Sequence, residues 1–284
     1  MKDERFFPLD RITLVGVLNL TPDSFSDGGR FVSEAGLDAA AAVAAGLALV
    51  RDGAHVIDVG GESTRPGAAR VSPESEIRRT SGVIEALAKA TDAPISIDTR
   101  KASVARAALD AGARIVNDVS GLADPELAPL CAERGATLIV GHLRGEPETM
   151  QAEPRFADVV AEVTEELSAS LARACAAGVA RERLVVDPGI GFGKTLEHNL
   201  ALLAGLGALR RALGLPVLVG TSRKSFLGRL TGDPVGERGT ATQAADAIAI
   251  YEGADALRVH DVAAARRTAT LADALRRARQ EAAS

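Results

Sequence analysis

The sequence predicts an α/β fold, a single (β/α)8 TIM barrel in one domain spanning residues 1–284, with its core from about 12 to 280. Short runs rich in Val, Ile and Leu alternate with longer segments of helical period, as in a parallel sheet covered by helices. Eight strands and eight helices in alternation favour a closed barrel over an open doubly wound sheet. The length of 284 residues is ordinary for such a barrel, and no Pro/Gly/Ser-rich linker divides the chain.

The apolar runs predict eight strands, and the Ala/Leu/Glu/Arg segments between them predict eight helices. The expected strands lie near 12–18, 55–59, 94–97, 114–117, 136–141, 183–187, 216–220 and 255–259. The expected helices lie near 35–52, 74–90, 101–111, 124–134, 157–177, 197–213, 240–252 and 262–280.

Glycines mark the ends of several predicted helices. Gly53, Gly112, Gly135 and Gly253 each follow a helical segment and stand just before a strand. Glycine adopts the left-handed conformation that ends a helix without a Cβ clash. We therefore expect tight turns at the bottom of the barrel, where they serve stability rather than chemistry.

Polar side chains follow every predicted strand at its other end. They are Asn19, Asp58 with Glu62, Asp98, Asn117 with Asp118, His142, Asp187, Arg223 with Lys224, and Arg258 with His260. The carboxyl ends of parallel strands meet at one rim of a barrel, and that rim holds the active site. Any one of these residues could instead cap the following helix, but eight caps at once would be a weaker explanation.

Long connections fall on the same rim, at 20–34, 60–74, 142–156, 188–196 and 221–239. They exceed what a βα turn needs, and long loops in a compact domain usually bind or cover something. Phe25, Phe31, Phe192 and Phe226 lie in or beside them, in a chain with no Trp and one Tyr. These rings predict the enclosure of a flat ligand, although packing under the loops is the simpler alternative for each ring alone.

Composition excludes several classes of function. A net charge of −5 argues against a nucleic-acid partner, because such proteins usually carry a basic stripe. No apolar run is long enough for a membrane span, and the charged N-terminus does not resemble a signal peptide. The two cysteines, Cys131 and Cys175, predict buried inert thiols, and the four histidines lack zinc spacing. We expect a cytoplasmic protein without a membrane partner.

Two rim loops contain dense motifs. The first, NLTPDSFSDGG at 19–29, is rich in oxygen ligands and small residues, as a mobile lid over a polar substrate would be. The second, DVGGESTRPG at 58–67, has glycines that let backbone amides approach a ligand, and its Thr64 and Arg65 can donate to phosphate oxygens.

These two segments resemble the signature segments of the dihydropteroate synthase family, which are pterin-binding TIM-barrel enzymes. The resemblance continues in order with SIDTRK at 96–101, IVNDVSG at 115–121, DPGIGFGKT at 187–195, GTSRKSFLG at 220–228 and RVHDV at 258–262. Seven segments in register, spanning roughly residues 12–265, make a chance match very improbable.

The resemblance implies a transferase of folate biosynthesis that forms a C–N bond. Such an enzyme condenses (7,8-dihydropterin-6-yl)methyl diphosphate with 4-aminobenzoate and releases 7,8-dihydropteroate and diphosphate. Its cofactor is Mg²⁺, and its partners are these two small-molecule substrates. Sulfonamides mimic aminobenzoate and should therefore compete with it.

The resemblance also assigns residues to three subsites. The pterin subsite would contain Asp98, Asn117, Asp187 and Lys224. The diphosphate subsite would contain Asn19, Thr64, Arg65, Arg258 and His260, with Asn19 as the Mg²⁺ contact. The aminobenzoate subsite would contain Phe25, Thr64, Pro66, Phe192, Lys224 and Ser225. Asp98, Lys224 and the loop residue Asp27 are the expected catalytic residues.

Some features depart from expectation or only imitate another motif. GIGFGKT ends like a Walker A loop, but the first glycine of that motif would fall at Pro188. After the fifth strand many family members carry Met-His-Met, whereas this chain has Gly141-His142-Leu143. Gly141 removes a side chain that would help to enclose the pterin, which leaves the shape of that wall open.

Two other functions stay open. A methyltetrahydrofolate-binding domain of a corrinoid methyltransferase shares this type of pocket, but it has no use for the Arg258 and His260 pair. A catalytically silent paralogue would bind folate precursors or another protein, and scrambled first loops would favour it. The family is commonly homodimeric, and the Ala-rich helices near 240–252 and 262–280 could supply the interface.

Overall fold

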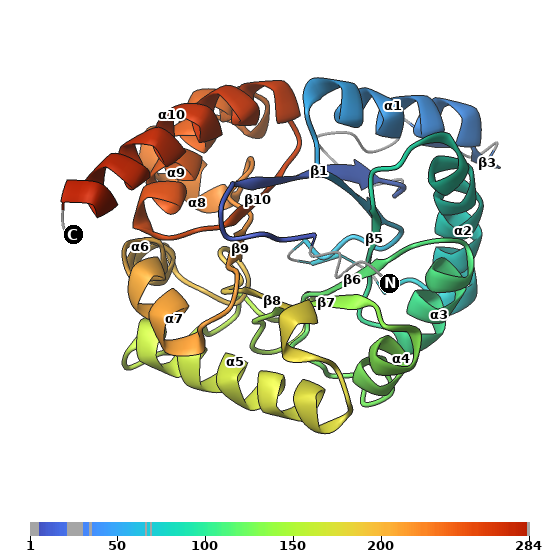
Figure 1. Cartoon of the computed structure of the whole chain (residues 1–284), viewed down its shortest axis with the longest axis horizontal. Coiled ribbons are helices and arrows are strands. Elements are labelled where there is room, and N and C mark those ends of the chain that lie inside the picture. The colour runs from blue at the N-terminus through green and yellow to red at the C-terminus, as the bar shows by residue number, and fades with distance from the viewer. Residues whose placement is uncertain (1–5, 22–30, 34–35, 66, 69, 283–284) are drawn as a thin grey trace.

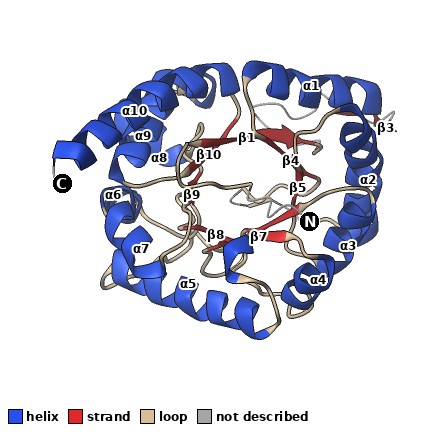
Figure 2. Ribbon diagram, in the orientation of Figure 1, coloured by secondary structure: helices blue, strands red, loops and turns tan. Residues whose placement is uncertain are grey.

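The computed structural model describes residues 6–21, 31–33, 36–65, 67–68 and 70–282. Eight parallel strands form a barrel at the centre of the molecule, and helices surround it as a ring (Figure 1 and Figure 2). The (β/α)8 barrel expected from the sequence is confirmed. Within this part of the chain, no helix has the length and apolar character needed to cross a membrane.

The barrel strands are short and almost wholly buried. They are β1 (Thr13–Asn19), β4 (Val56–Gly60), β5 (Ile95–Asp98), β6 (Ile115–Asp118), β7 (Thr137–Gly141), β8 (Leu184–Asp187), β9 (Leu218–Val219) and β10 (Ala256–Val259). They lie in the order β8-β7-β6-β5-β4-β1-β10-β9, and a parallel bridge between Val186 and Val217 closes the ring from β8 to β9. A hairpin of β2 (Val32–Ser33) and β3 (Gly36–Leu37) lies outside this ring.

Every predicted helix is present. The helices are α1 (Ala39–Asp52), α2 (Pro73–Ala90), α3 (Ala102–Asp110), α4 (Leu127–Arg134), α5 (Val159–Ala176), α6 (Leu196–Ala204), α7 (Leu206–Leu213), α8 (Ser225–Thr231), α9 (Gly239–Glu252) and α10 (Val262–Ala282). Short 3-10 turns lie at Arg181–Arg183 and Val235–Glu237.

Three helices differ from the sequence prediction. The helix expected from residue 35 begins at Ala39, because Asp38 caps it by accepting from the amide of Ala41 at 2.9 Å. The helix expected at 197–213 is broken at Gly205, which ends α6 and begins α7. The connection expected at 221–239 contains α8, which buries Phe226 and Leu227.

The strand alternation divides the apolar core into two clusters. One fills the lower interior of the barrel and contains Phe7, Val15, Val56, Ile115, Ile139, Val185, Leu218 and Ala256. The larger one lies between the strands and the helices. Because side chains alternate along a strand, the next inward positions of the same strands lie one layer nearer to the rim.

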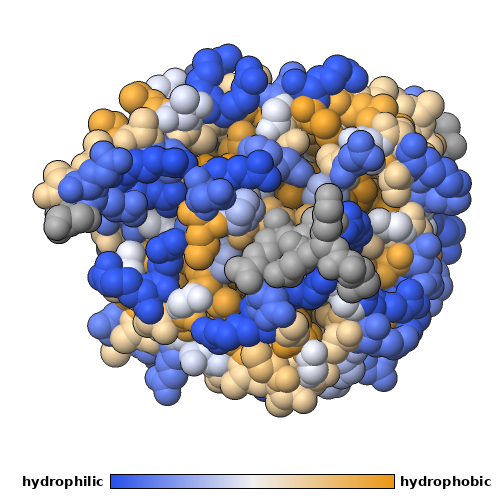
Figure 3. Space-filling view, in the orientation of Figure 1, coloured by the Kyte–Doolittle hydropathy of each residue, from blue (hydrophilic) through white to orange (hydrophobic). Residues whose placement is uncertain are grey.

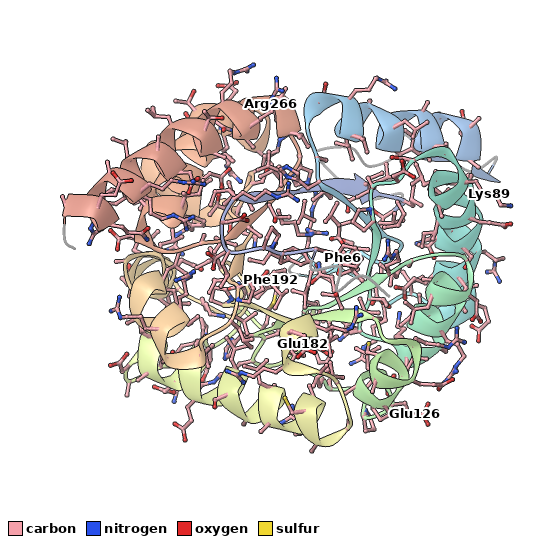
Figure 4. All side chains as sticks on the ribbon, in the orientation of Figure 1. Phe6, Lys89, Glu126, Glu182, Phe192 and Arg266 are labelled. Atoms are coloured by element: carbon pink, nitrogen blue, oxygen red, sulfur yellow. The ribbon has the colours of Figure 1, made fainter. Side chains whose placement is uncertain are left out.

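The bottom of the barrel is built for stability. Gly53, Gly135 and Gly253 end their helices at φ values of 111°, 59° and 129°, as the sequence predicted. The Phe6 ring lies beside the lower interior cluster, 4.6 Å below the Arg114 guanidinium, and Figure 4 labels it near the barrel axis. In the space-filling view, hydrophilic side chains cover much of α10 and α2 at the periphery (Figure 3).

The cysteine prediction is half right. Cys131 is buried on α4, and burial raises the pKa of its thiol to about 12. Cys175 is exposed, because it lies on the outer face of α5 among residues that point to solvent. An Ala-rich helical sequence alone did not show which cysteine lies on a buried helix face and which on an exposed one.

Candidate active site

The inward positions above the apolar floor are polar. Asp58 lies two residues after Val56 on β4, and Asn117 lies two residues after Ile115 on β6. The same step along β8 and β10 leads from Val185 to Asp187 and from Ala256 to Arg258; on β5, Ser96 and Asp98 hold the alternate positions. The period of two along each strand therefore brings these side chains together at the mouth of the barrel.

Arg258 connects two acidic side chains from neighbouring strands. Its Nε donates to Asp58 Oδ2 at 2.6 Å, and its Nη2 donates to Asp98 Oδ2 at 2.6 Å. Asn117 Nδ2 also donates to Asp58 Oδ2, at 3.1 Å. Burial opposes the charge of Arg258, but the carboxylates of Asp58 and Asp98 outweigh it and raise the pKa of the guanidinium.

Asp98 is a carboxyl group that titrates near neutrality. Burial raises its pKa to about 7, and Arg258 opposes that shift, while the negative charge of Asp58 adds to it. Perturbed carboxyl groups of this kind cluster at functional sites. Gly60 keeps the space beside it open, because a Cβ there would lie 3.7 Å from Asp98 Oδ2 and 3.5 Å from Asn19 Oδ1.

Several buried oxygens at the mouth have no hydrogen-bond partner in the described structure. They are Asp58 Oδ1, Ser96 Oγ, Asp98 Oδ1 and Asn117 Oδ1. Buried polar groups of folded proteins are nearly always hydrogen-bonded, since an unpaired one costs about 1–3 kcal/mol. Four such oxygens at one mouth indicate a site for a ligand that carries hydrogen-bond donors.

Asp187 and Lys224 lie on the opposite wall. The Asp187 carboxylate accepts from the amide of Gly189 at 2.7 Å, and burial raises its pKa. Burial lowers the pKa of Lys224 to about 8, although the charge of Asp187 opposes the shift. Lys224 Nζ donates to the carbonyl oxygen of Ile190 and lies 4.4 Å from the centroid of the Phe192 ring.

Positive charge gathers nearer to the rim around His260. Burial lowers the pKa of His260 to about 3, and the charges of Arg258, Arg223, Arg65 and Lys224 lower it further. His260 Nδ1 lies 2.9 Å from Ser222 Oγ. A neutral imidazole among several cations leaves this part of the mouth strongly electropositive, which suits an anion.

An ion-pair network holds the connection after β4. Buried Glu62 accepts from the amide of Val71 at 2.8 Å and from Lys101 Nζ at 2.9 Å. Lys101 also donates to Glu76 of α2, at 2.8 Å. These contacts connect Glu62 at the start of this connection to Val71 at its end and, through Lys101, to α2, so Glu62 supports the segment that carries Thr64 and Arg65.

The comparisons with known proteins agree with this geometry. The family model described as pterin binding enzyme matches residues 15–260. A dihydropteroate synthase of Mycobacterium leprae is 50% identical over 254 residues, which cover 85% of this chain and 86% of that protein.

The chain belongs to the dihydropteroate synthase family.

Solved structures of the family share the fold. A Yersinia pestis dihydropteroate synthase with a sulfonamide drug complex superposes with a TM-score of 0.89 at 40% identity, over 95% of this chain and 96% of that one. A Xanthomonas albilineans dihydropteroate synthase with 4-aminobenzoic acid superposes with a TM-score of 0.85 at 44% identity, over 94% of each chain. This protein is thus a transferase of folate biosynthesis.

The structure brings most of the residues predicted by the family resemblance to one mouth. Contacts or charge interactions connect Asp98, Asn117, Asp187, Lys224, Arg258, His260 and Arg65. Asn19 Oδ1 borders the space beside Gly60 that Asp98 also borders, and the Phe192 ring lies beside Lys224. Figure 4 labels Phe192 near β9 and close to the barrel axis.

Some predicted residues lie elsewhere or outside the description. Phe25, Asp27 and Pro66 fall outside the described residues. Ser225 is the first residue of α8 and is exposed. Thr64 follows Ser63 in the connection after β4 and is half-buried.

The sequence reading missed Asp58 and Ser96 as site residues. The sequence singles out Asp58 as a polar strand end and as the first residue of one family motif, and Ser96 as the first residue of another, without a role for either. The signal that could have found them is the period of two, because each stands two residues before Gly60 or Asp98 on the same strand. Both therefore face inward beneath the residues that the motif suggested.

The structure also defines the wall at Gly141. A Cβ there would lie 2.7 Å from Val119 Cα and 2.9 Å from the carbonyl oxygen of Asp118. The backbone after β6 therefore occupies the space that a side chain would need. In this protein the wall is made by main chain rather than by a side chain.

Proposed function

We propose that the described residues divide the reaction of the family among three adjoining subsites at the barrel mouth. The reaction condenses (7,8-dihydropterin-6-yl)methyl diphosphate with 4-aminobenzoate and gives 7,8-dihydropteroate and diphosphate. One observation carries the proposal: a group of unpaired buried oxygens lies beside a cluster of cations at the same mouth. The first suits a heterocycle rich in donors, and the second suits its diphosphate.

Asp98, Asn117, Asp187 and Lys224 form the pterin subsite of this proposal. The pyrimidine edge of a pterin presents an amino group and a ring N–H beside a carbonyl oxygen. Asp98 Oδ1 and Asn117 Oδ1 are unpaired acceptors for such donors, and Lys224 is a donor for the carbonyl. Matching a buried polar edge in this way discriminates against analogues, because a mismatch leaves a group unpaired.

Asp98 has a second role in the proposal. If the bond between the pterin methylene carbon and the diphosphate oxygen breaks before the amine attacks, positive charge develops on the pterin. An ionised Asp98 beside the ring stabilises that charge, as preorganised groups do in electrostatic catalysis. We therefore propose a dissociative displacement in which Asp98 and Lys224 are catalytic residues, with Asp27 of the first loop as the third.

Arg258, His260, Arg65, Thr64 and Asn19 form the diphosphate subsite. Arginine binds phosphate oxygens in bidentate fashion, and the surrounding cations attract the anion. His260 is neutral without a ligand, because its pKa is lowered to about 3. The negative charge of a bound diphosphate opposes that shift, so His260 can donate to the leaving group from the ring nitrogen that does not face Ser222.

The residues at the diphosphate subsite fit a magnesium ion. In the described part of the chain, no three His, Cys, Asp or Glu side chains gather as a metal site. Mg²⁺ needs no such cluster, because it binds through one or two protein oxygens together with phosphate oxygens and water. Asn19 Oδ1 faces the space above Gly60 and would hold it. When bound, Mg²⁺ supplies neutralisation of the charge on the leaving diphosphate.

Phe192, Thr64, Lys224 and Ser225 form the aminobenzoate subsite, with Phe25 and Pro66 from the two loops. The Phe192 ring offers a flat apolar face for the benzene ring of the substrate. Lys224 lies against the same face and so borders both substrates. The relatives with bound 4-aminobenzoic acid and with a sulfonamide support a site for both classes of ligand, which we expect to compete.

A homodimer completes the proposal. Ile248 and Tyr251 on α9 and Leu271 and Leu275 on α10 are exposed, and these two helices pack against each other. Clustered exposed apolar side chains commonly mark an interface. Sedimentation velocity distinguishes monomer from dimer. We also propose a cytoplasmic location, which fits the free thiols of both cysteines.

The direct test is turnover by the purified protein. We expect diphosphate release when the protein is incubated with the pterin diphosphate, 4-aminobenzoate and Mg²⁺, and loss of that release when a sulfonamide competes. Binding of the pterin diphosphate without turnover would instead identify a catalytically silent binder. Absence of both binding and turnover would contradict the site as a whole.

A further inference from the structure

The turn after β8, residues 188–193, is held through the polar backbone groups of its four central residues, 189–192. The amide of Gly189 donates to Asp187, that of Gly191 donates to Asn199 Oδ1 at 2.5 Å, and that of Phe192 donates to the carbonyl of Gly189. The carbonyl of Gly191 accepts from Gln151 Nε2 at 3.0 Å. The turn is therefore anchored by side chains from other segments.

The backbone of this turn would not keep its shape alone. Gly189, Gly191 and Gly193 have φ values of 68°, 84° and 58°, in the left-handed region that glycine adopts freely. At Gly189 a Cβ would lie 1.9 Å from the carbonyl oxygen of His142. Three glycines allow the turn to approach the neighbouring connection closely, but their freedom means that external contacts must hold it in place.

Two lysines hold the turn from opposite sides. On the side of the barrel mouth, Lys224 donates to the carbonyl of Ile190 and lies over the Phe192 ring. On the other side, Lys194 Nζ donates to the carbonyl of Phe192 at 2.9 Å and lies 3.0 Å from His142 Nδ1. Only Lys224 faces the substrates of the proposed function.

Lys194 is buried, with 3% of the residue's surface exposed. Burial lowers the pKa of its ammonium group to about 7, and the charge of Asp187 opposes that shift. Burying an ammonium group is costly unless specific partners compensate. An apolar residue would fill this position at lower cost, so the contacts of the ammonium group call for an explanation beyond packing.

The partner of Lys194 is itself oriented. Burial lowers the pKa of His142 to about 4, and the charge of Lys194 lowers it further, so the imidazole is neutral. With Nδ1 accepting from Lys194, the proton of the ring lies on Nε2, 3.0 Å from Glu166 Oε2. Arg144 fixes Glu166 in turn, through Nε at 2.9 Å. The contacts from Lys194 to His142 and from His142 to Glu166 therefore connect the turn to α5.

We propose that Lys194 is a positioning residue: it holds the 188–193 turn so that the Phe192 ring and the Ile190 carbonyl keep their places beside Lys224. The inference rests on the proposed aminobenzoate subsite and deepens it. Lys194 touches neither substrate, and it acts on the reaction through the wall on which aminobenzoate lies. Gln151, which is exposed, holds the same turn from outside at Gly191.

The test is Lys194→Met, which keeps the length of the side chain and removes its donors. We expect the KM for aminobenzoate to rise about tenfold or more, because small misplacements near a reacting group are costly. We expect kcat and the Kd of the pterin diphosphate to change less than the KM for aminobenzoate, since Asp98 and Asn117 of the pterin subsite stand on β5 and β6 rather than on the turn. Amide hydrogen exchange at Gly191 and Phe192 should accelerate.

Two further variants sharpen the result. Gln151→Ala removes an exposed anchor of the turn, so it should fold normally and raise the same KM by a smaller factor. Arg155→Ala is the matched control, because its exposed guanidinium pairs only with Glu153 in the described structure, and both constants should stay unchanged.

Each other outcome would overturn the inference in a distinct way. Unchanged amide exchange in Lys194→Met would show that Lys194 does not hold the turn, and this readout is valid even if the wild-type protein lacks turnover. Faster exchange with an unchanged KM for aminobenzoate would separate the turn from that substrate. A Lys194→Met protein that fails to fold would make Lys194 a requirement of the fold rather than a positioning residue.

Discussion

The two ends of the barrel use buried charge in opposite ways. At the bottom, one carboxylate meets two guanidinium groups: Asp255 Oδ2 accepts from Arg210 Nε at 2.8 Å, and Asp255 Oδ1 lies 3.6 Å from Arg276 Nη1. At the mouth, one guanidinium group meets two carboxylates, because Arg258 donates to both Asp58 and Asp98. The lower cluster therefore has two cations around one anion, and the upper cluster has two anions around one cation.

The difference lies in what else the groups bind. Asp255 also accepts from the amide of Val217 at 3.1 Å, and Arg276 donates to the carbonyl of Ala254 at 2.9 Å. The lower cluster therefore binds the backbone at the starts of β9 and β10. In the upper cluster, the contacts of Arg258 run between side chains, and oxygens of Asp58 and Asp98 stay unpaired. Asp255 Oδ1 also has no hydrogen-bond partner in the described structure, so the two clusters differ in their backbone contacts: the lower one secures the starts of two strands, whereas Arg258 bridges side chains.

Asp98→Asn should have the largest effect on activity. The change removes the charge that serves the pterin donors and the developing cation, so we expect kcat/KM to fall by about 10³-fold or more. The free energy of unfolding should change less than in Asp255→Asn, because Arg258 keeps Asp58 as an ion-pair partner. Steady-state kinetics and thermal unfolding measure the two quantities, and a near-normal kcat/KM would show that the pterin assignment is wrong.

Asp255→Asn should show the reverse pattern at the other end. Removing one partner of a buried ion pair typically costs about 3–5 kcal/mol of stability, because the remaining charges are left uncompensated. We expect such a loss in urea unfolding, while kcat/KM at a temperature where the variant is folded stays within about threefold of wild type. A variant with full stability and impaired catalysis would break the comparison between the two ends.

The smallest expected effect is the pH dependence of pterin binding. Asp98 has a raised pKa of about 7 and must be ionised to accept from the pterin, so affinity should fall as the pH drops below 7, by up to about tenfold per unit. Lys224 has a lowered pKa of about 8 and must be protonated, so affinity should also fall above 8. Calorimetric titration across this range measures both limbs, and Asp98→Asn should lack the acidic one.

Much of the fold was predictable because its signals are local. All eight strands were found from continuous apolar runs, since a strand buried on both faces needs no polar alternation. Asp38 could have corrected the start of α1, because it is a typical N-cap residue three positions after the expected start. The break at Gly205 and the helix α8 depend on packing: a Cβ at Gly205 would lie 2.7 Å from Val160 of α5, and α8 exists where it buries Phe226.

The site residues that lie in family motifs were predictable from the sequence. The family segments led to Asp98, Asn117, Asp187, Lys224, Arg258 and His260, and the structure gathers these six at one mouth. The motifs did not reveal that Asp58 is the second carboxylate bound to Arg258, or that Lys194 binds the 188–193 turn. Those roles depend on contacts between residues up to 200 positions apart, such as the bond from Arg258 to Asp58.

The sequence by itself determined the barrel, the family and the chemical types of residue at the strand ends, because hydrophobic period and short motifs are encoded between near neighbours in the chain. Only the tertiary structure decided which of those residues share a hydrogen-bond acceptor, which buried oxygens stay unpaired, and which of the two lysines, Lys194 and Lys224, lies on the side of the barrel mouth. Burial and pairing arise from strands and turns that meet in space, and they set each charge's pKa and partners.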